Sequence, residues 1–268
     1  ITAQYPMLTP YQFASNTPIQ AIDLDGLEAW NITKKWDDKN IFAYKNYVTK
    51  QVEQYKRQGD YFWCEDLALS LIIDFAAANG LPFTFTNGVR DFNASTSKLS
   101  FNDFKNEVLK TSAAPDIAAN TVSLRDTREQ DSGSTLNKAD LLIWKTGSVP
   151  SHVQIVVDFF YREDPYSYNA LIAQGNGNRL PKHLKNSNPN SVFYGGSLVQ
   201  YGKLDLETGR YVTLNDDGTE NDGHLYSNIF RQYNFFGGYS TEIKQWDFQK
   251  FNTSINLPTN KTKNDEAK

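Results

Sequence analysis

The sequence predicts an α+β fold in which N-terminal helices pack on an antiparallel β-sheet. Apolar residues recur at helical spacing in the first half of the chain, whereas short apolar or β-branched runs between turn residues dominate after about residue 138. The composition, 39% hydrophobic and 14% aromatic over 268 residues, fits a globular chain with a substantial core. Helices followed by a meander of strands are typical of the α+β class.

The clearest helix is predicted over residues 64–79. Its apolar side chains fall on one stripe, Glu65 and Asp66 occupy the first turn, and Gly80 provides a stop signal. Weaker helical patterns lie at 40–56 and 101–111.

Strands are expected where β-branched or apolar runs are bounded by turn residues. These runs cover residues 139–144, 152–159, 168–174, 191–194, 210–214 and 229–236. The chain is expected to divide into a Pro-rich leader, a linker, one folded domain and a polar flexible tail. Their respective ranges are 1–28, 29–39, 40–251 and 252–268.

Charge and composition exclude several classes of function. The net charge is −4 and no Lys/Arg cluster is present, so we expect no nucleic-acid partner. The single cysteine excludes an intrachain disulfide and a Cys-based zinc site, and no motif indicates a metal or another cofactor. No apolar run approaches the roughly 20 residues of a membrane span. The N-terminus lacks the pattern of a signal peptide.

Cys64 is the most informative residue because it stands where the clearest helix begins. A helix N-terminus lowers the pKa of a thiol and favours the reactive thiolate. A cysteine nucleophile also needs a base, usually histidine. His152 is the best candidate because it opens a predicted strand, whereas His183 and His224 lie in polar, loop-like stretches.

Three further residues could complete a catalytic site. Gln174, at the end of the strand after that of His152, could accept or donate a hydrogen bond and fix the tautomer of the imidazole. Asn176 is the alternative for this third position. Either the Gln58 amide or the Cys64 backbone N–H could donate to a developing oxyanion.

Residues 58–176 resemble the papain-like cysteine hydrolases, particularly the NlpC/P60 and related amidase branch. The resemblance lies in the order of Trp63-Cys64 opening a helix, the strand 139–144 and the strand that begins at 151–156. It implies a Cys64 nucleophile, a His152 base and Gln174 as the polar third residue. This chain has Ala139 where the family usually has Gly. Its acidic pair after Cys64 should oppose formation of the thiolate.

Residues 5–28 resemble the end of the core domain of Rhs/YD-repeat proteins. The matched elements are residues 8–16, Pro18-Ile19 and residues 22–28. In that family this segment closes a repeat shell and a variable C-terminal toxin domain follows. The resemblance therefore implies that residues after about 28 form a toxin, with the Rhs shell of the parent protein and a cognate immunity protein as partners.

These observations lead to one principal hypothesis and two alternatives. The first is a secreted effector of interbacterial competition, delivered into a target cell by a secretion system. It would cleave a peptide or amide bond, most plausibly in peptidoglycan. The second is a protein deamidase or transglutaminase toxin that uses the same Cys-His site. The third is a non-catalytic binding module whose many aromatic residues form a ligand face.

Overall fold

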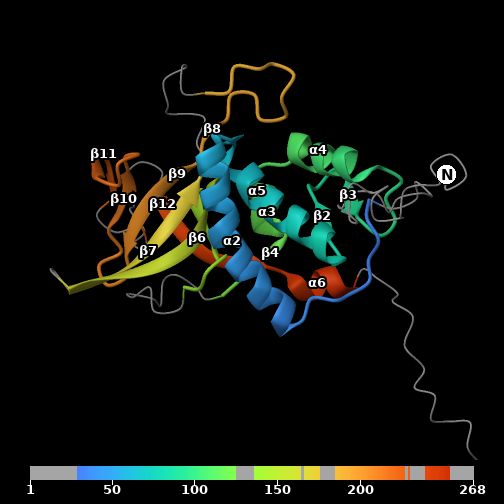
Figure 1. Cartoon of the computed structure of the whole chain (residues 1–268), viewed down its shortest axis with the longest axis horizontal. Helices are drawn as coiled ribbons and strands as arrows, with labels where there is room; N and C mark the ends of the chain where they lie inside the picture. Colours follow the sequence, from blue (N-terminus) through green and yellow to red (C-terminus); the bar gives the residue numbers. More distant parts are fainter. Residues whose placement is uncertain are drawn as a thin grey trace, which may run out of the picture.

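The computed structural model describes residues 29–124, 136–163, 166–175, 185–226, 229 and 239–253. An eight-stranded antiparallel sheet lies beside a layer of helices (Figure 1), with the strand order β11-β10-β9-β7-β6-β5-β12-β4. Strand β12 returns to pair with β5, and β4 lies outside it. The strands are β4 (Thr121–Ser123), β5 (Leu141–Thr146), β6 (Val149–Glu163), β7 (Tyr166–Gln174), β9 (Gln200–Asp205), β10 (Tyr211–Leu214), β11 (Glu220–Tyr226) and β12 (Tyr239–Trp246).

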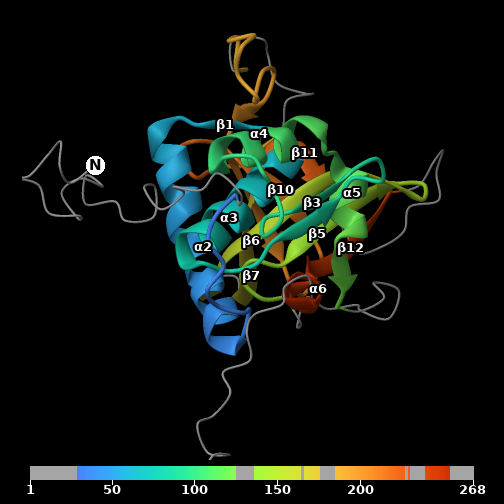
Figure 2. The same cartoon turned by 90° about the vertical axis from the view of Figure 1, so that its right-hand side faces the viewer.

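The helices gather on one face of this sheet (Figure 2). They are α2 (Asp38–Gln58), α3 (Cys64–Asn79), α4 (Phe101–Thr111), α5 (Ala114–Ala119) and α6 (Phe248–Thr253). Two small sheets accompany them: β1 (Tyr61–Phe62) pairs with β8 (Ser197–Leu198), and β2 (Thr84–Thr86) pairs with β3 (Asp91–Asn93). Among the described helices, none combines the length and apolar character needed to cross a bilayer.

Helix α3 is the central helix because most of its residues are buried. It starts after the extended residue Trp63 and ends at Gly80, whose φ of 64° is left-handed. A Cβ at Gly80 would also lie 2.5 Å from the Thr33 hydroxyl, so glycine is required there for two reasons. The helix packs against β6.

The sheet has a hydrophobic core on each face. Val153, Ile155 and Val157 of β6 pack with the helices, whereas Val156 packs with a second cluster on the other face. Neighbouring residues of β6 point to opposite faces because a strand has a two-residue period. Since both faces are buried, the sequence of β6 is an apolar run rather than a strict alternation of apolar and polar residues.

The sequence predicted the helices better than the strands. The helices at 64–79 and 101–111 have the predicted bounds, and α2 extends two residues beyond 40–56 at each end. The strands at 139–144, 152–159, 168–174 and 210–214 correspond to β5, β6, β7 and β10 with shifted ends. Of the predicted strand at 229–236, only Ile229 lies within the described residues.

The strand predicted at 191–194 is wrong, since this segment is a turn. The backbone N–H of Ser191 donates to Asn188, and that of Tyr194 donates to Ser191. Asn186 also donates from its side chain to the Ser191 hydroxyl at 2.9 Å. Short polar side chains that bond to nearby groups favour turns over strand ladders, which outweighs the β propensity of Val192 and its aromatic neighbour.

The linker predicted at 29–39 is also wrong, because this segment belongs to the folded domain. The indole N–H of Trp30 donates to the Leu81 carbonyl, and that of Trp36 donates to the Pro82 carbonyl, both at 2.8 Å. At the other end, Asn252 lies within α6 rather than in the predicted tail. The leader 1–28 and the rest of the tail lie outside the described residues, so their assignments stay predictions.

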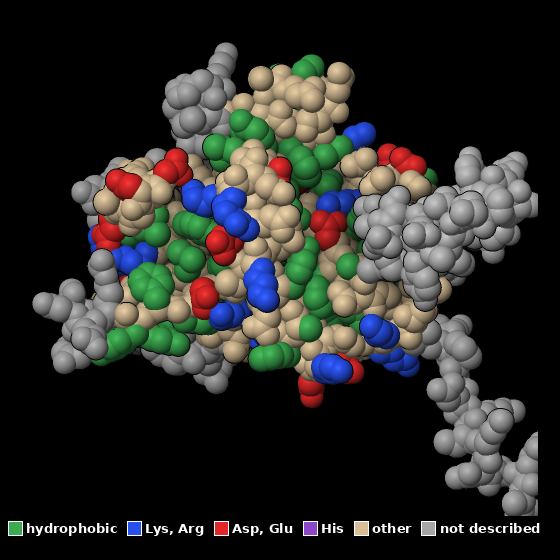
Figure 3. All heavy atoms as spheres, viewed as in Figure 1, with side chains coloured by type: hydrophobic (Ala, Val, Ile, Leu, Met, Phe, Trp, Pro, Cys, Tyr) green, Lys and Arg blue, Asp and Glu red, His purple; other side chains and the backbone are tan. Residues whose placement is uncertain are grey.

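Positively and negatively charged side chains are interspersed on the face shown in Figure 3.

Ala139→Gly is expected to stabilise the fold by up to about 1 kcal/mol. Ala139 is buried and has a φ of 67°, a left-handed conformation that costs a non-glycine residue about 1–2 kcal/mol. The greater flexibility of glycine in the unfolded chain offsets part of the gain. Urea unfolding of both proteins would measure the difference. The matched control is Ala78→Gly in α3, which should destabilise by about 1 kcal/mol.

Candidate active site

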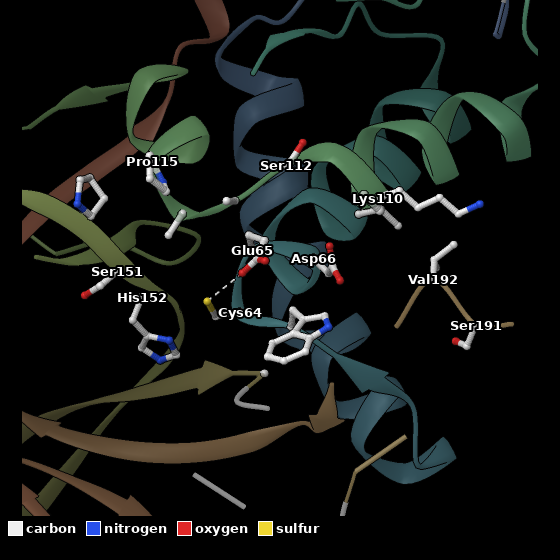
Figure 4. Close-up of a pocket in the computed structure, with 16 residues that line it drawn as sticks. Cys64, Glu65, Asp66, Lys110, Ser112, Pro115, Ser151, His152, Ser191 and Val192 are labelled. Atoms are coloured by element: carbon white, nitrogen blue, oxygen red, sulfur yellow. Dashed lines mark hydrogen bonds between the residues drawn. The ribbon is translucent and has the colours of Figure 1, made fainter. Parts of the chain in front are cut away.

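A cavity of about 540 Å³ lies where the N-terminus of α3 meets the start of β6 (Figure 4). Five parts of the chain contribute to its walls: residues 63–66 at the start of α3, the α4–α5 junction, residues 150–152 of β6, Gly175 after β7, and residues 191–192. The cavity thus lies between the helical layer and one end of the sheet, and both contribute to its walls.

Cys64 and His152, far apart in the sequence, both line this cavity. Cys64 is the first residue of α3 and is half-buried. The backbone N–H of Val153, the residue after His152, lies against the Cys64 sulfur. Figure 4 draws the sulfur and the imidazole on the same side of the cavity, while the Lys110 side chain extends away from them. The structure therefore places the predicted nucleophile and the predicted base on the walls of one cavity.

Gln174 meets His152 as the sequence suggested. The imidazole Nε2 and the Gln174 Oε1 are 2.7 Å apart, and Gln174 is the last residue of β7. Strands β6 and β7 are neighbours in the sheet, which places the two residues near the same end. Gln174 is 3% exposed, so this hydrogen bond is sheltered from water.

Two further residues continue this contact into the core. Gln154 Nε2 donates to Gln174 Oε1 at 2.6 Å, and Trp144 Nε1 donates to Gln154 Oε1 at 2.7 Å. Neither residue is predicted as a site residue from the sequence. The available signal was the spacing of His152 and Gln154, because residues two apart on a strand share one face.

The electrostatic surroundings of Cys64 differ from the sequence expectation. The thiol donates a hydrogen bond to the Glu65 carboxylate at 2.9 Å. Burial, followed by the charge of Glu65 and this hydrogen bond, raises the pKa of the Cys64 thiol well above its ordinary value. The backbone N–H of Glu65, in the first turn of α3, lowers the pKa of the thiol as expected at a helix start, but burial and the Glu65 carboxylate outweigh it, so the expected reactive thiolate is not favoured. Of the acidic pair expected to oppose the thiolate, Glu65 raises the pKa of the thiol, whereas Asp66 is not among the causes of the shift.

Asp66 contributes little negative charge at neutral pH. Burial, with a smaller contribution from Glu65, raises the pKa of the Asp66 carboxyl to about 8. The carboxyl is therefore largely protonated at pH 7, and the charge beside the thiol comes from Glu65.

Glu65→Gln is expected to lower the pKa of Cys64 and speed its alkylation by iodoacetamide at pH 7. A neighbouring carboxylate shifts a pKa by about 1–3 units, so the gain in rate should be about tenfold or more. The pH profile of alkylation, followed by mass spectrometry, measures it. Glu107→Gln, which removes an exposed carboxylate paired with Arg90, is the control. An unchanged profile in Glu65→Gln would contradict the role of this charge.

Gly175 allows the start of α3 to approach the end of β7. A Cβ at this position would lie 2.4 Å from the Phe62 carbonyl oxygen and 2.7 Å from that of Trp63. Gly196 faces the same segment from another side, since its Cβ would lie 2.8 Å from the Phe62 carbonyl carbon. The two glycines thus permit the close contact that sets Cys64 next to the ends of β6 and β7.

The remaining predicted site residues lie elsewhere. Gln58 is the exposed last residue of α2, and it is not among the described residues that line the cavity. Helix α2 continues to Gln58 and leaves its side chain on the solvent side. Asn176, His183 and the His224 side chain lie outside the described residues. For an oxyanion, the Cys64 backbone N–H remains a candidate, because the N-cap Trp63 provides no side-chain acceptor for the first turn of α3.

Comparison with protein-family models, curated proteins and solved structures finds no match to this chain. The described residues also contain no group of three His, Cys, Asp or Glu side chains arranged to hold a metal ion. A functional assignment therefore depends on the chemistry of the cavity and on the sequence resemblances.

Proposed function

We propose that this chain is a papain-like cysteine hydrolase that cleaves a peptide or amide bond. The observation that carries the proposal is the position of His152, which shares a cavity with Cys64 and bonds to Gln174 through Nε2. A nucleophile, a base and a residue that orients the base are the three parts of such a site.

The reaction is acyl transfer in two steps. His152 takes the thiol proton as the Cys64 sulfur attacks the carbonyl carbon, and then gives that proton to the leaving amine as the C–N bond breaks. Water next attacks the thioester, with His152 again as base, and releases the acid and the thiol. Because the resting thiol is protonated and bonded to Glu65, removal of its proton by His152 belongs to the attack itself.

The N-terminus of α3 supports the charge that develops in this reaction. The Cys64 backbone N–H would donate to the oxyanion, in a position where the helix dipole favours negative charge. The Glu65 carboxylate opposes that charge while it stays bonded to the thiol. We infer that substrate entry displaces the Glu65 side chain, which would free the sulfur.

The biological role that we propose is that of a toxin. The resemblance of residues 5–28 to an Rhs core end supports delivery into a competing bacterium, with a cognate immunity protein in the producing cell. Peptidoglycan is the proposed substrate, since it combines peptide and amide bonds and is exposed to delivered effectors.

Purified peptidoglycan treated with this chain tests the proposal. Release of muropeptides, identified by mass spectrometry, is expected for the native chain and not for Cys64→Ala. Mass spectrometry of proteins from intoxicated cells separates the alternative, because deamidation changes the mass of a glutamine without cutting the chain. Full toxicity of Cys64→Ala would overturn the catalytic proposal and favour a binding module.

A further inference from the structure

We propose that Trp144 and Gln154 are positioning residues that fix the tautomer of His152. The inference rests on the proposed function, because it concerns the nitrogen through which His152 would act as a base. The supporting observation is the direction of three consecutive hydrogen bonds. They join Trp144 to Gln154, Gln154 to Gln174, and Gln174 to His152.

The direction of the first bond is fixed by chemistry. An indole N–H can only donate, so the group of Gln154 that faces Trp144 must be its oxygen. The amide nitrogen of Gln154 then faces Gln174, and it can only donate. Gln174 must therefore present its oxygen at that contact, 2.6 Å from the Gln154 nitrogen.

The same Gln174 oxygen contacts His152 Nε2 at 2.7 Å. An oxygen that accepts at this contact requires a protonated Nε2. In the neutral imidazole, protonation of Nε2 leaves Nδ1 as the basic nitrogen. Nδ1 is thus the atom that would take the thiol proton of Cys64. If the bonds had the opposite direction, the Gln174 amide nitrogen would donate to Nε2 and the proton of the neutral ring would be on Nδ1. Nδ1 could then not accept the thiol proton.

Burial makes this direction difficult to reverse. Trp144, Gln154 and Gln174 are 7%, 2% and 3% exposed, so water cannot replace a lost partner. Reversal would set the Trp144 N–H against the amide N–H₂ of Gln154 and leave buried donors unsatisfied. The indole itself packs against Tyr211 and Tyr226, with ring centroids 5.8 and 4.9 Å away.

The strand register builds this arrangement into the sheet. Trp144 of β5 pairs directly with His152 of β6, and Leu142 pairs with Gln154. His152 and Gln154 therefore share a face of β6, the face that carries the second core. If the role of these hydrogen bonds were purely structural, they would satisfy buried polar groups without determining which nitrogen of His152 is protonated. The tautomer of His152 therefore distinguishes a structural role from a positioning role.

The experiment measures the ring ¹⁵N chemical shifts of His152 at a pH above its titration, with the signal assigned by its loss in His152→Ala. The native chain is expected to show a protonated Nε2 and an unprotonated Nδ1. In Trp144→Phe the Gln154 amide can turn over, so the ratio of the two tautomers should fall by about fivefold or more. The control is Trp30→Phe, which removes an equally buried indole N–H on the helical side of the sheet, where it donates to the Leu81 carbonyl. This variant should leave the tautomer of His152 unchanged.

A second substitution restores the direction without Trp144. A carboxylate at position 174 can only accept, so Trp144→Phe combined with Gln174→Glu should return His152 to the Nε2-protonated form. If Trp144→Phe fails to fold, Gln154→Leu serves in its place, because it removes the donor that fixes the orientation of the Gln174 amide. It should cause the same loss of preference for the Nε2-protonated tautomer. A protonated Nδ1 in the native chain, or an unchanged tautomer in the folded variants, would overturn the inference.

The outcomes for the two proposals are separable. Muropeptide release by the native chain together with an unchanged tautomer in Trp144→Phe would sink the positioning role alone. A shifted tautomer in Trp144→Phe, together with no hydrolytic activity of the native chain, would contradict the proposed function. The inference that the hydrogen bonds fix the tautomer would still hold. If both hold, Trp144→Phe should lower kcat with little change in KM, because Trp144 does not line the cavity.

Discussion

Cys64→Ala and His152→Ala are each expected to lower kcat for amide hydrolysis by about 10³-fold or more. The first substitution removes the nucleophile, and the second removes the only imidazole among the residues described at the cavity. The raised pKa of the Cys64 thiol makes the base indispensable, since little thiolate exists without proton transfer. Losses of this size are typical when one member of a nucleophile–base pair is removed.

The double variant provides the internal control for this prediction. Residues that act as a unit are not additive, so Cys64→Ala/His152→Ala should be about as inactive as either single variant. Initial rates of muropeptide release measure activity, and thermal unfolding confirms that each variant is folded. A folded His152→Ala that retains a tenth or more of the native rate would contradict the role of His152 as the base.

Gly175→Ala is expected to lower activity by about 10²-fold and stability by about 1–3 kcal/mol. The added methyl group would lie 2.4 to 2.7 Å from three backbone atoms of Phe62 and Trp63, which cannot rotate away as a side chain could. The start of α3 must shift, and Cys64 shifts with it relative to His152. Small displacements of a reacting group are sufficient for a loss of this size.

Gly218→Ala is the matched control for the Gly175 substitution. Gly218 lies in the β10–β11 turn with a φ of +82°, and nothing lies within 4 Å of an added Cβ. It should cost about 1–2 kcal/mol of stability through its backbone alone and leave activity unaffected. Equal activity losses in the two variants, measured at a temperature where both are folded, would show that the contact at Gly175 does not position Cys64.

The sequence predicted best where local chemistry decides the structure. The helix at 64–79 ends at Gly80, and the helix at 101–111 begins after Ser100, whose hydroxyl accepts from the Asp103 N–H. These caps are local signals that the sequence shows directly. Cys64, His152 and Gln174 could be selected because each stands at the end of a predicted element, although β6 begins three residues before His152.

What the sequence could not predict depends on contacts between distant segments. The pKa of Cys64 depends on burial, which the position at a helix start does not reveal. Gln58 has suitable spacing from Cys64, but the continuation of α2 directs it to solvent. The bonds of Gln154 to Trp144 and Gln174 require the register of three strands, and no single segment contains that information.

The contact between Trp36 and Asn252 has a consequence for how the domain is produced. Asn252 accepts from the Trp36 backbone N–H at 2.8 Å and donates to its carbonyl at 2.7 Å, across 216 positions of sequence. Phe248 and Phe251 of α6 pack on the same indole, with ring centroids 4.7 and 6.2 Å away. A ribosome must therefore translate nearly the whole domain before α6 can close the core beneath α2. Chains that stop short of α6 would lack the contacts of Phe248 and Phe251 with the Trp36 ring, so this part of the core can be completed only after α6 has been synthesised.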